Sequence, residues 1–122
     1  MKAPRQSGFT LIEVLVALTI VAIALFAGTQ ATTALARSSQ RQTDLLLAQI
    51  SIDNAFYGLR LAKQFPDIGE RSLECKQGGR AFNLKMQINP TQNPSLRKVV
   101  ANVDDVERAY GILQVSTVIG RY

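Results

Sequence analysis

The chain has 122 residues, of which 14 are lysine or arginine and 9 are aspartate or glutamate, giving a net charge of +5. It has no histidine, which excludes imidazole-based catalytic relays and most zinc sites, and one cysteine, which excludes an intramolecular disulfide. The basic residues are scattered and form no stripe of the kind that binds nucleic acid. We therefore expect no enzyme activity, no cofactor, no metal and no nucleic-acid partner.

The N-terminal region combines a short basic segment with a long apolar run. Residues 1–8 read MKAPRQSG, and residues 9–28 read FTLIEVLVALTIVAIALFAG. Twenty helical residues span about 30 Å, the thickness of the hydrocarbon core of a bilayer. Lys2 and Arg5 precede the run, so the positive-inside rule places the N-terminus in the cytoplasm and the bulk of the chain outside. We predict a transmembrane helix over residues 9–28.

Glu13 is the one charged residue of this run, and a carboxylate at membrane depth costs about 2–3 kcal/mol, less near the interface. Two forms of compensation can coexist. Thr10 and Glu13 have the spacing of a capping box at a helix start. If the chain is cut between Gly8 and Phe9, a new ammonium forms at Phe9, and that of a neighbouring subunit could pair with Glu13.

An ordinary secretory signal peptide is the competing interpretation of the same region. Ala34-Leu35-Ala36 supplies a small-residue cleavage site, and the product would be a soluble protein that begins at Arg37. The apolar run is longer than a typical signal-peptide core and has a carboxylate in its first turn. Both features favour the membrane anchor.

Residues 29–64 predict a continuation of the helix into water. Residues 29–44 are small and polar, and an apolar stripe then recurs every three or four residues, as in an amphipathic helix that packs on a following domain. The helix should end near Gln64, because Pro66 disfavours helix in the residue before it. The stripe comprises Leu45, Ala48 or Gln49, Ile52, Ala55 or Phe56, Leu59 and Ala62.

Residues 65–122 predict a small antiparallel β-sheet, so the fold class is α+β, with a long N-terminal helix packed on the sheet. Strands are expected over residues 72–76, 80–88, 96–103 and 112–119, the first two joined by a glycine-rich hairpin at residues 77–79. In the last strand, alternation places Leu113, Val115, Thr117 and Ile119 on one face and Ile112, Gln114, Ser116 and Val118 on the other.

Few side chains of this domain are candidates for a site. Asp104, Asp105 and Glu107 lack the loop pattern of a calcium site, and we interpret them as a solvated turn. Phe82 and Tyr110 are interpreted as packing residues.

The stretch Gly8-Phe9-Thr10-Leu11-Ile12-Glu13, after a basic leader and at the head of an apolar helix, resembles the class III signal of type IV pilins and type II secretion pseudopilins. The resemblance implies that residues 1–8 are a leader that a prepilin peptidase removes by cutting between Gly8 and Phe9. It also implies N-methylation of Phe9 and a role for Glu13 in docking to a neighbour during assembly.

Within that family, residues 48–69 resemble the minor pseudopilin I subunit, whose motif A-x-N-x-x-x-x-L-R-L is matched by Asn54, Leu59, Arg60 and Leu61. Residues 96–99 (LRKV) resemble a strand of the same subunit, whereas residues 70–95 lack its tryptophan. The resemblance implies a minor pseudopilin of the type II secretion system, at the tip of a pseudopilus that supports protein export across the outer membrane.

The same resemblance implies a single-pass protein of the bacterial inner membrane with a periplasmic domain over residues 65–122. Its implied partners are J-, K- and H-like minor pseudopilins, the major pseudopilin and the prepilin peptidase. The near alternative is a minor pilin of a type IV pilus or competence filament. The alternative of another class is an exported binding protein with an ordinary signal peptide.

Overall fold

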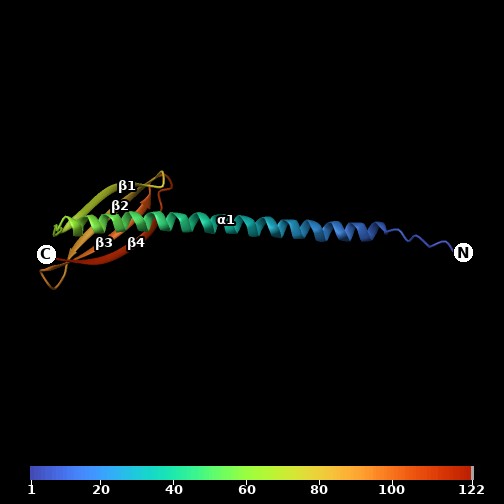
Figure 1. The fold of residues 1–122 in the computed structure, drawn as a ribbon, viewed down its shortest axis with the longest axis horizontal. Coiled ribbons are helices and arrows are strands. Elements are labelled where there is room, and N and C mark those ends of the chain that lie inside the picture. Colours follow the sequence, from blue (N-terminus) through green and yellow to red (C-terminus); the bar gives the residue numbers. More distant parts are fainter. Residues whose placement is uncertain (122) are drawn as a thin grey trace. The chain divides into compact units, whose positions relative to one another are not determined.

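The computed structural model describes residues 1–121 and contains one helix followed by four strands (Figure 1). The chain divides into two compact units, residues 1–40 and the residues from Arg41 onward. The elements are α1 (Leu11–Leu61), β1 (Gly69–Gln77), β2 (Arg80–Pro90), β3 (Leu96–Asp105) and β4 (Gly111–Gly120). The predicted α+β fold is confirmed, and each strand extends beyond its predicted bounds by one to three residues at one or both ends.

The first unit consists of residues 1–10, which have no regular structure, and the N-terminal portion of α1. Every side chain from residue 11 to residue 28 is exposed, although this stretch is almost entirely apolar. Within α1 lies a window long and apolar enough to cross a membrane, with a mean hydropathy of 2.6. Burial of this surface must therefore come from outside the chain.

The end of α1 follows the prediction and is closed by backbone hydrogen bonds. Lys63 has a φ of 49°, the left-handed conformation that usually falls to glycine at this position. Its N–H donates to the carbonyl of Arg60 over 3.1 Å, and the N–H of Gln64 donates to the carbonyl of Leu59 over 3.3 Å. These two bonds form a Schellman motif, which ends the helix shortly before Pro66.

The sheet has the strand order β1-β2-β3-β4, with all neighbours antiparallel. The β1–β2 turn consists of Gly78 and Gly79, whose φ values of 57° and 76° fit a two-residue hairpin turn that glycine adopts without strain. A Cβ atom on Gly78 would lie 3.1 Å from the side chain of Leu47. Glycine at this position therefore also lets the hairpin pack closely against α1.

One face of the sheet packs on the C-terminal portion of α1 and forms the core of the second unit (Figure 1). The helix contributes Ala48, Ile52 and Phe56, which follow one another at intervals of four residues, as the apolar stripe predicted. Burying a large apolar side chain contributes about 1.5–3 kcal/mol, so this small core is the main source of the domain's stability. The strands contribute Phe82, Leu84, Met86, Ile88, Val99, Ala101, Val103 and Ile119.

The predicted face of Ile112 is wrong, because β3 and β4 shift register at their start. Val103 pairs with Leu113 and Asp104 pairs with Gly111, so Ile112 is an extra residue in β4. Such a bulge turns two successive side chains toward one face. Ile112 and Leu113 therefore both pack against the core, while Gln114, Ser116 and Val118 remain on the outer face as predicted.

Candidate functional site

The start of α1 is held by Thr10 and Glu13 in a reciprocal capping box. The N–H of Glu13 donates to the Thr10 hydroxyl over 3.3 Å, and the Glu13 carboxylate accepts the N–H of Thr10 at 3.5 Å. The Thr10 carbonyl accepts the first helical hydrogen bond from Val14. The capping role that the sequence predicts for Glu13 is thus present in the structure.

Gly8 and Phe9 lie in the exposed, irregular segment just before this cap. A Cβ atom added to Gly8 would have no neighbour within 4 Å, and the Phe9 side chain is exposed. A cut between them would leave Phe9 as the single residue before Thr10. Both partners of the capping box would survive such a cut, because neither belongs to the leader.

The carboxylate of Glu13 has no ion pair within residues 1–121, since the pairs between described residues involve other groups. Its capping bond, at 3.5 Å, uses some of its hydrogen-bonding capacity but supplies no opposite charge. In an apolar environment a charge in this state needs a cation from elsewhere.

The threonines of the N-terminal portion of α1 form their hydrogen bonds within the helix. The hydroxyl of Thr19 donates to the carbonyl of Leu15 over 2.9 Å, and those of Thr29, Thr32 and Thr33 bond in the same way to carbonyls three or four residues earlier. These hydroxyls therefore need no water, which suits a helix surrounded by lipid or by other helices.

A second cluster, which the sequence did not reveal, joins α1 to the sheet through charged groups. Asp44 on α1 and Asp105 at the end of β3 are almost fully buried, and the guanidinium of Arg80, at the start of β2, forms ion pairs with both. Arg80 also stacks on Phe82, with its guanidinium carbon 5.5 Å from the ring centre. We call Asp44, Arg80 and Asp105 the ionic cluster.

The loop between β3 and β4 adds further bonds to the ionic cluster. Asp105 accepts the backbone N–H groups of Glu107 and Arg108 over 2.9 and 3.3 Å. The hydroxyl of Tyr110 donates to Asp44 over 2.9 Å, and the guanidinium of Arg108 lies 3.6 Å from the same carboxylate. Two carboxylates thus face two guanidiniums, and the loop is held against α1.

These contacts correct two predictions about the turn. Asp105 is buried instead of solvated, and Tyr110 is a half-exposed hydrogen-bond donor instead of a packing residue. Phe82 is fully buried in the core, as predicted. Among residues 1–121, no three His, Cys, Asp or Glu side chains are placed to hold a metal ion. The ionic cluster joins α1 to both hairpins through ion pairs and hydrogen bonds.

The ionisation of Asp105 follows from these contacts. Burial alone would raise the pKa of its carboxyl, but the N–H groups of Glu107 and Arg108 and the Arg80 guanidinium stabilise the carboxylate. The pKa of Asp105 is lowered as a net result. The charged form of Asp105 is therefore the form that the fold favours.

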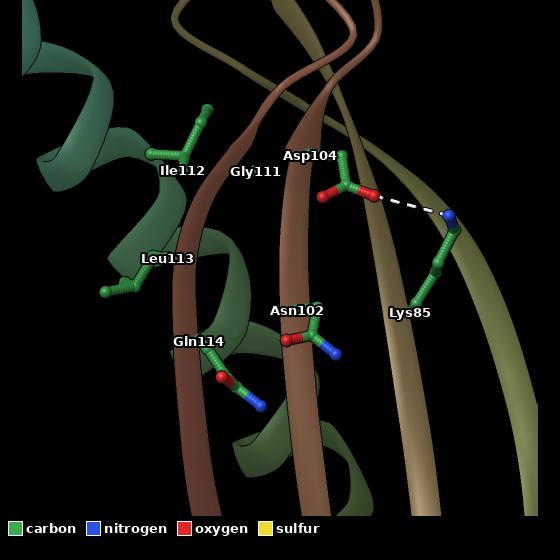
Figure 2. A pocket seen from close by; sticks show the side chains of 7 residues that line it. All are labelled: Lys85, Asn102, Asp104, Gly111, Ile112, Leu113 and Gln114. Atoms are coloured by element: carbon green, nitrogen blue, oxygen red, sulfur yellow. Dashed lines mark ion pairs between the residues drawn. The ribbon is translucent and has the colours of Figure 1, made fainter.

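The outer face of the sheet carries a shallow polar hollow between β2, β3 and β4. Figure 2 shows Lys85, Asn102, Asp104 and Gln114 along it, with the Lys85 ammonium 3.3 Å from the Asp104 carboxylate. Lys85 is well exposed to solvent. The hollow offers amide and charged groups but no hydroxyl or thiol.

An exposed apolar stripe runs along the side of α1 that faces away from the core. It consists of Leu46, Ile50, Tyr57 and Leu61. These residues follow one another at intervals of four, seven and four residues, so they lie on one helix face. It lies in the second unit, beyond the apolar run of residues 9–28. We call these four residues the outer stripe.

Comparison with known proteins covers both units. A family model described as type II secretion system protein I matches residues 43–120, and a model of the prokaryotic N-terminal methylation motif matches residues 3–29. The type II secretion system protein I of Klebsiella pneumoniae is 34% identical over 99 residues, covering 81% of this chain and 82% of the relative. That of Pseudomonas aeruginosa is 32% identical over 96 residues, covering 79% and 74%.

Replacing Arg80 by alanine should lower the free energy of unfolding by about 3 kcal/mol, because two buried carboxylates lose their common cation. Urea unfolding of the full chain in detergent, followed by circular dichroism, would measure the loss. The matched control is Lys85→Ala, which breaks a more exposed pair and should cost less than about 1 kcal/mol. Equal losses in both variants would refute a special role for the ionic cluster.

The lowered pKa of Asp105 predicts a stability that declines in acid. A carboxyl whose pKa is lower in the folded state contributes stability above its unfolded pKa of about 3.9, and this contribution is lost as the pH falls through the folded value. Unfolding measured from pH 7 down to pH 2 should show this decline. The variant Asp105→Asn should be less stable at pH 7 and should show a shallower decline. An equally steep decline in the variant would contradict the assignment.

Proposed function

The chain belongs to the type II secretion system protein I family, and from this premise we propose that it is a minor pseudopilin that is cut after Gly8, methylated at Phe9 and assembled at the pseudopilus tip. A minor pseudopilin role follows from the family itself. The observation that carries the finer proposal is an unpaired Glu13 carboxylate that caps an exposed apolar helix directly after an accessible Gly8–Phe9 bond.

Anchoring in the inner membrane fits the family and the single apolar helix near the N-terminus. We propose that residues 9–28 span the bilayer once, with the leader of residues 1–8 in the cytoplasm. Lys2 and Arg5 support this orientation by the positive-inside rule. Residues 29–64 would then continue the helix outside the membrane, and residues 65–122 would form the periplasmic sheet domain.

The proposed cut supplies the cation that Glu13 lacks. It creates an ammonium at Phe9, and addition of a single methyl group to that nitrogen would retain the positive charge. When subunits stand side by side in a filament, the ammonium of one can approach Glu13 of the next at a similar depth. A pair of this kind, formed away from water, favours docked subunits over isolated ones and sets their axial register.

The water-facing portion of α1 offers a second assembly surface. The outer stripe exposes Leu46, Ile50, Tyr57 and Leu61. Exposure of a row of large, mainly apolar side chains to water is unfavourable and is typical of a binding surface. Packing against the helices of other pseudopilins would bury them. We propose J-, K- and H-like minor pseudopilins and the major pseudopilin as these partners, and the prepilin peptidase as the processing enzyme.

We also propose that the protein has a structural role and does not catalyse a reaction. The relatives belong to a structural family, and the polar hollow on the outer sheet face is lined by amide and charged groups without a hydroxyl or thiol. The buried charges of the second unit are occupied in joining α1 to the hairpins. The side chains that remain available lie on helix and sheet surfaces suited to binding other subunits.

Processing is tested by replacing Gly8 with leucine. The side chain at residue 8 has open space around it, so the variant should insert and fold normally but keep its leader. Intact mass and N-terminal sequencing of protein from the native membrane should give a methylated Phe9 terminus for the unchanged chain and Met1 for the variant. A terminus at Arg37 in the unchanged chain would support the signal-peptide alternative and overturn the proposal.

The role of Glu13 is tested by a pair of substitutions. Glu13→Gln can still accept the Thr10 N–H but has no charge, whereas Glu13→Val loses both the cap and the charge. Both variants should insert into the membrane, and both should reduce secretion and co-purification with other pseudopilins at least about tenfold, a loss worth roughly 1.4 kcal/mol. Normal assembly of Glu13→Gln would leave capping as the whole role of Glu13.

A further inference from the structure

The two edge strands of the sheet differ in their charge. β1 carries four charged residues among nine, namely Glu70, Arg71, Glu74 and Lys76, whereas β4 (GILQVSTVIG) carries none among ten. Proteins protect exposed strand edges with charges, prolines, bulges or short strands, because an unprotected edge pairs with other extended chains. β1 has this protection, and β4, which also lacks proline, has little of it.

The backbone of β4 is open along its outer side. In the sheet of the described residues, β3 adjoins β4 on one side and no strand adjoins it on the other. The bulge at Ile112 lies at the very start of β4, and regular pairing with β3 continues from Leu113 to Gly120. Alternate N–H and carbonyl groups over this stretch therefore point outward in the geometry that an added strand requires.

The side chains of β4 are also incompletely covered. Leu113 and Val115 pack against the core but remain half-buried, and Val118 on the outer face is 52% exposed. Figure 2 shows Ile112 and Leu113 projecting toward the α1 side of β4, and Gln114 toward the polar hollow. A strand placed beside β4 would cover apolar groups on the first side and meet Gln114, Ser116 and Val118 on the second, none of which is charged.

We propose that β4 binds an extended, uncharged edge strand of another pseudopilin, which joins the sheet as a fifth strand. This inference rests on the function proposed above and selects one of the two sheet edges as the contact. A peptide strand matches the row of backbone donors and acceptors, and the absence of charge on β4 favours a neutral partner. The outer stripe faces away from the core, so strand addition leaves it available for helix packing.

The partner is a different chain and not a second copy of this one. Pairing of two β4 strands would create a closed two-fold dimer, in which the same surface is used by both chains. A filament instead repeats a head-to-tail contact in which two different surfaces meet. The other edge of the same chain, β1, carries four charged residues and is therefore a poor head-to-tail partner for the uncharged β4, which favours a strand from a neighbouring subunit with another sequence.

Hydrogen–deuterium exchange of the full chain tests this contact directly. The chain in detergent would be compared with the complex formed when it is co-expressed and co-purified with the other pseudopilins of the same secretion system. Alternate amides between Leu113 and Gly120 should exchange at least about tenfold more slowly in the complex, and the outward amides of β1 should not change.

The outcomes separate this inference from the proposed function. Recovery of the complex with unprotected β4 amides would overturn strand addition and leave the pseudopilin role intact. Failure of the unchanged chain to co-purify with any pseudopilin would overturn the proposed function and this contact with it. Protection of β4 in the chain alone, increasing with concentration, would identify a second copy as the occupant and refute a different partner.

A matched pair of variants checks the same contact without relying on exchange. Ser116→Glu places a charge on the outer face of β4 opposite Val100, and Ser72→Glu places one on β1 opposite Lys85. Ser116→Glu should reduce recovery of the complex at least about fivefold, a loss of roughly 1 kcal/mol, and Ser72→Glu should not. Slow exchange of β2 and β3 amides in each variant would verify folding, and equal recovery of both variants would refute the proposal.

Discussion

The packing of α1 on the sheet depends on one guanidinium. Arg80 lies between Asp44 on the helix and Asp105 at the end of β3, and both carboxylates are almost completely removed from water. Without that cation, closing the helix onto the sheet would bury two like charges. The ionic cluster therefore links the helix, the β1–β2 turn and the β3–β4 loop to one another, in addition to the apolar contacts of the core.

The two portions of α1 have surfaces that suit different surroundings. Toward its N-terminus the apolar side chains are all exposed and the threonine hydroxyls bond internally, which suits lipid or neighbouring helices. Toward its C-terminus one face is buried on the sheet, and the opposite face exposes the outer stripe. Both exposed surfaces are apolar and could be covered by other molecules, in agreement with membership of a family of type II secretion system components.

Features with a local physical cause could be predicted from the sequence. The apolar stripe from Leu45 onward predicted the buried side of α1, Pro66 its end, and Gly78-Gly79 the first hairpin, because each acts through its own backbone or its immediate neighbours. The ionic cluster could not be predicted, because Asp44 and Arg80 meet only after the sheet has formed. The bulge at Ile112 depends in the same way on how β3 and β4 pair, since alternation along β4 alone assigns that residue to the wrong face.

The position of the capping box has a consequence for how the subunit could leave the bilayer. The bonds that start α1 begin at Thr10, so removal of residues 1–8 would leave the fold of the helix unchanged. It would, however, remove Lys2 and Arg5, the side chains whose transfer through the membrane is most costly. The charges of the leader would thus oppose movement of the helix out of the bilayer. After their loss, the new N-terminal ammonium and the Glu13 carboxylate would together carry no net charge, which lowers the cost of transferring the helix from the lipid to a filament.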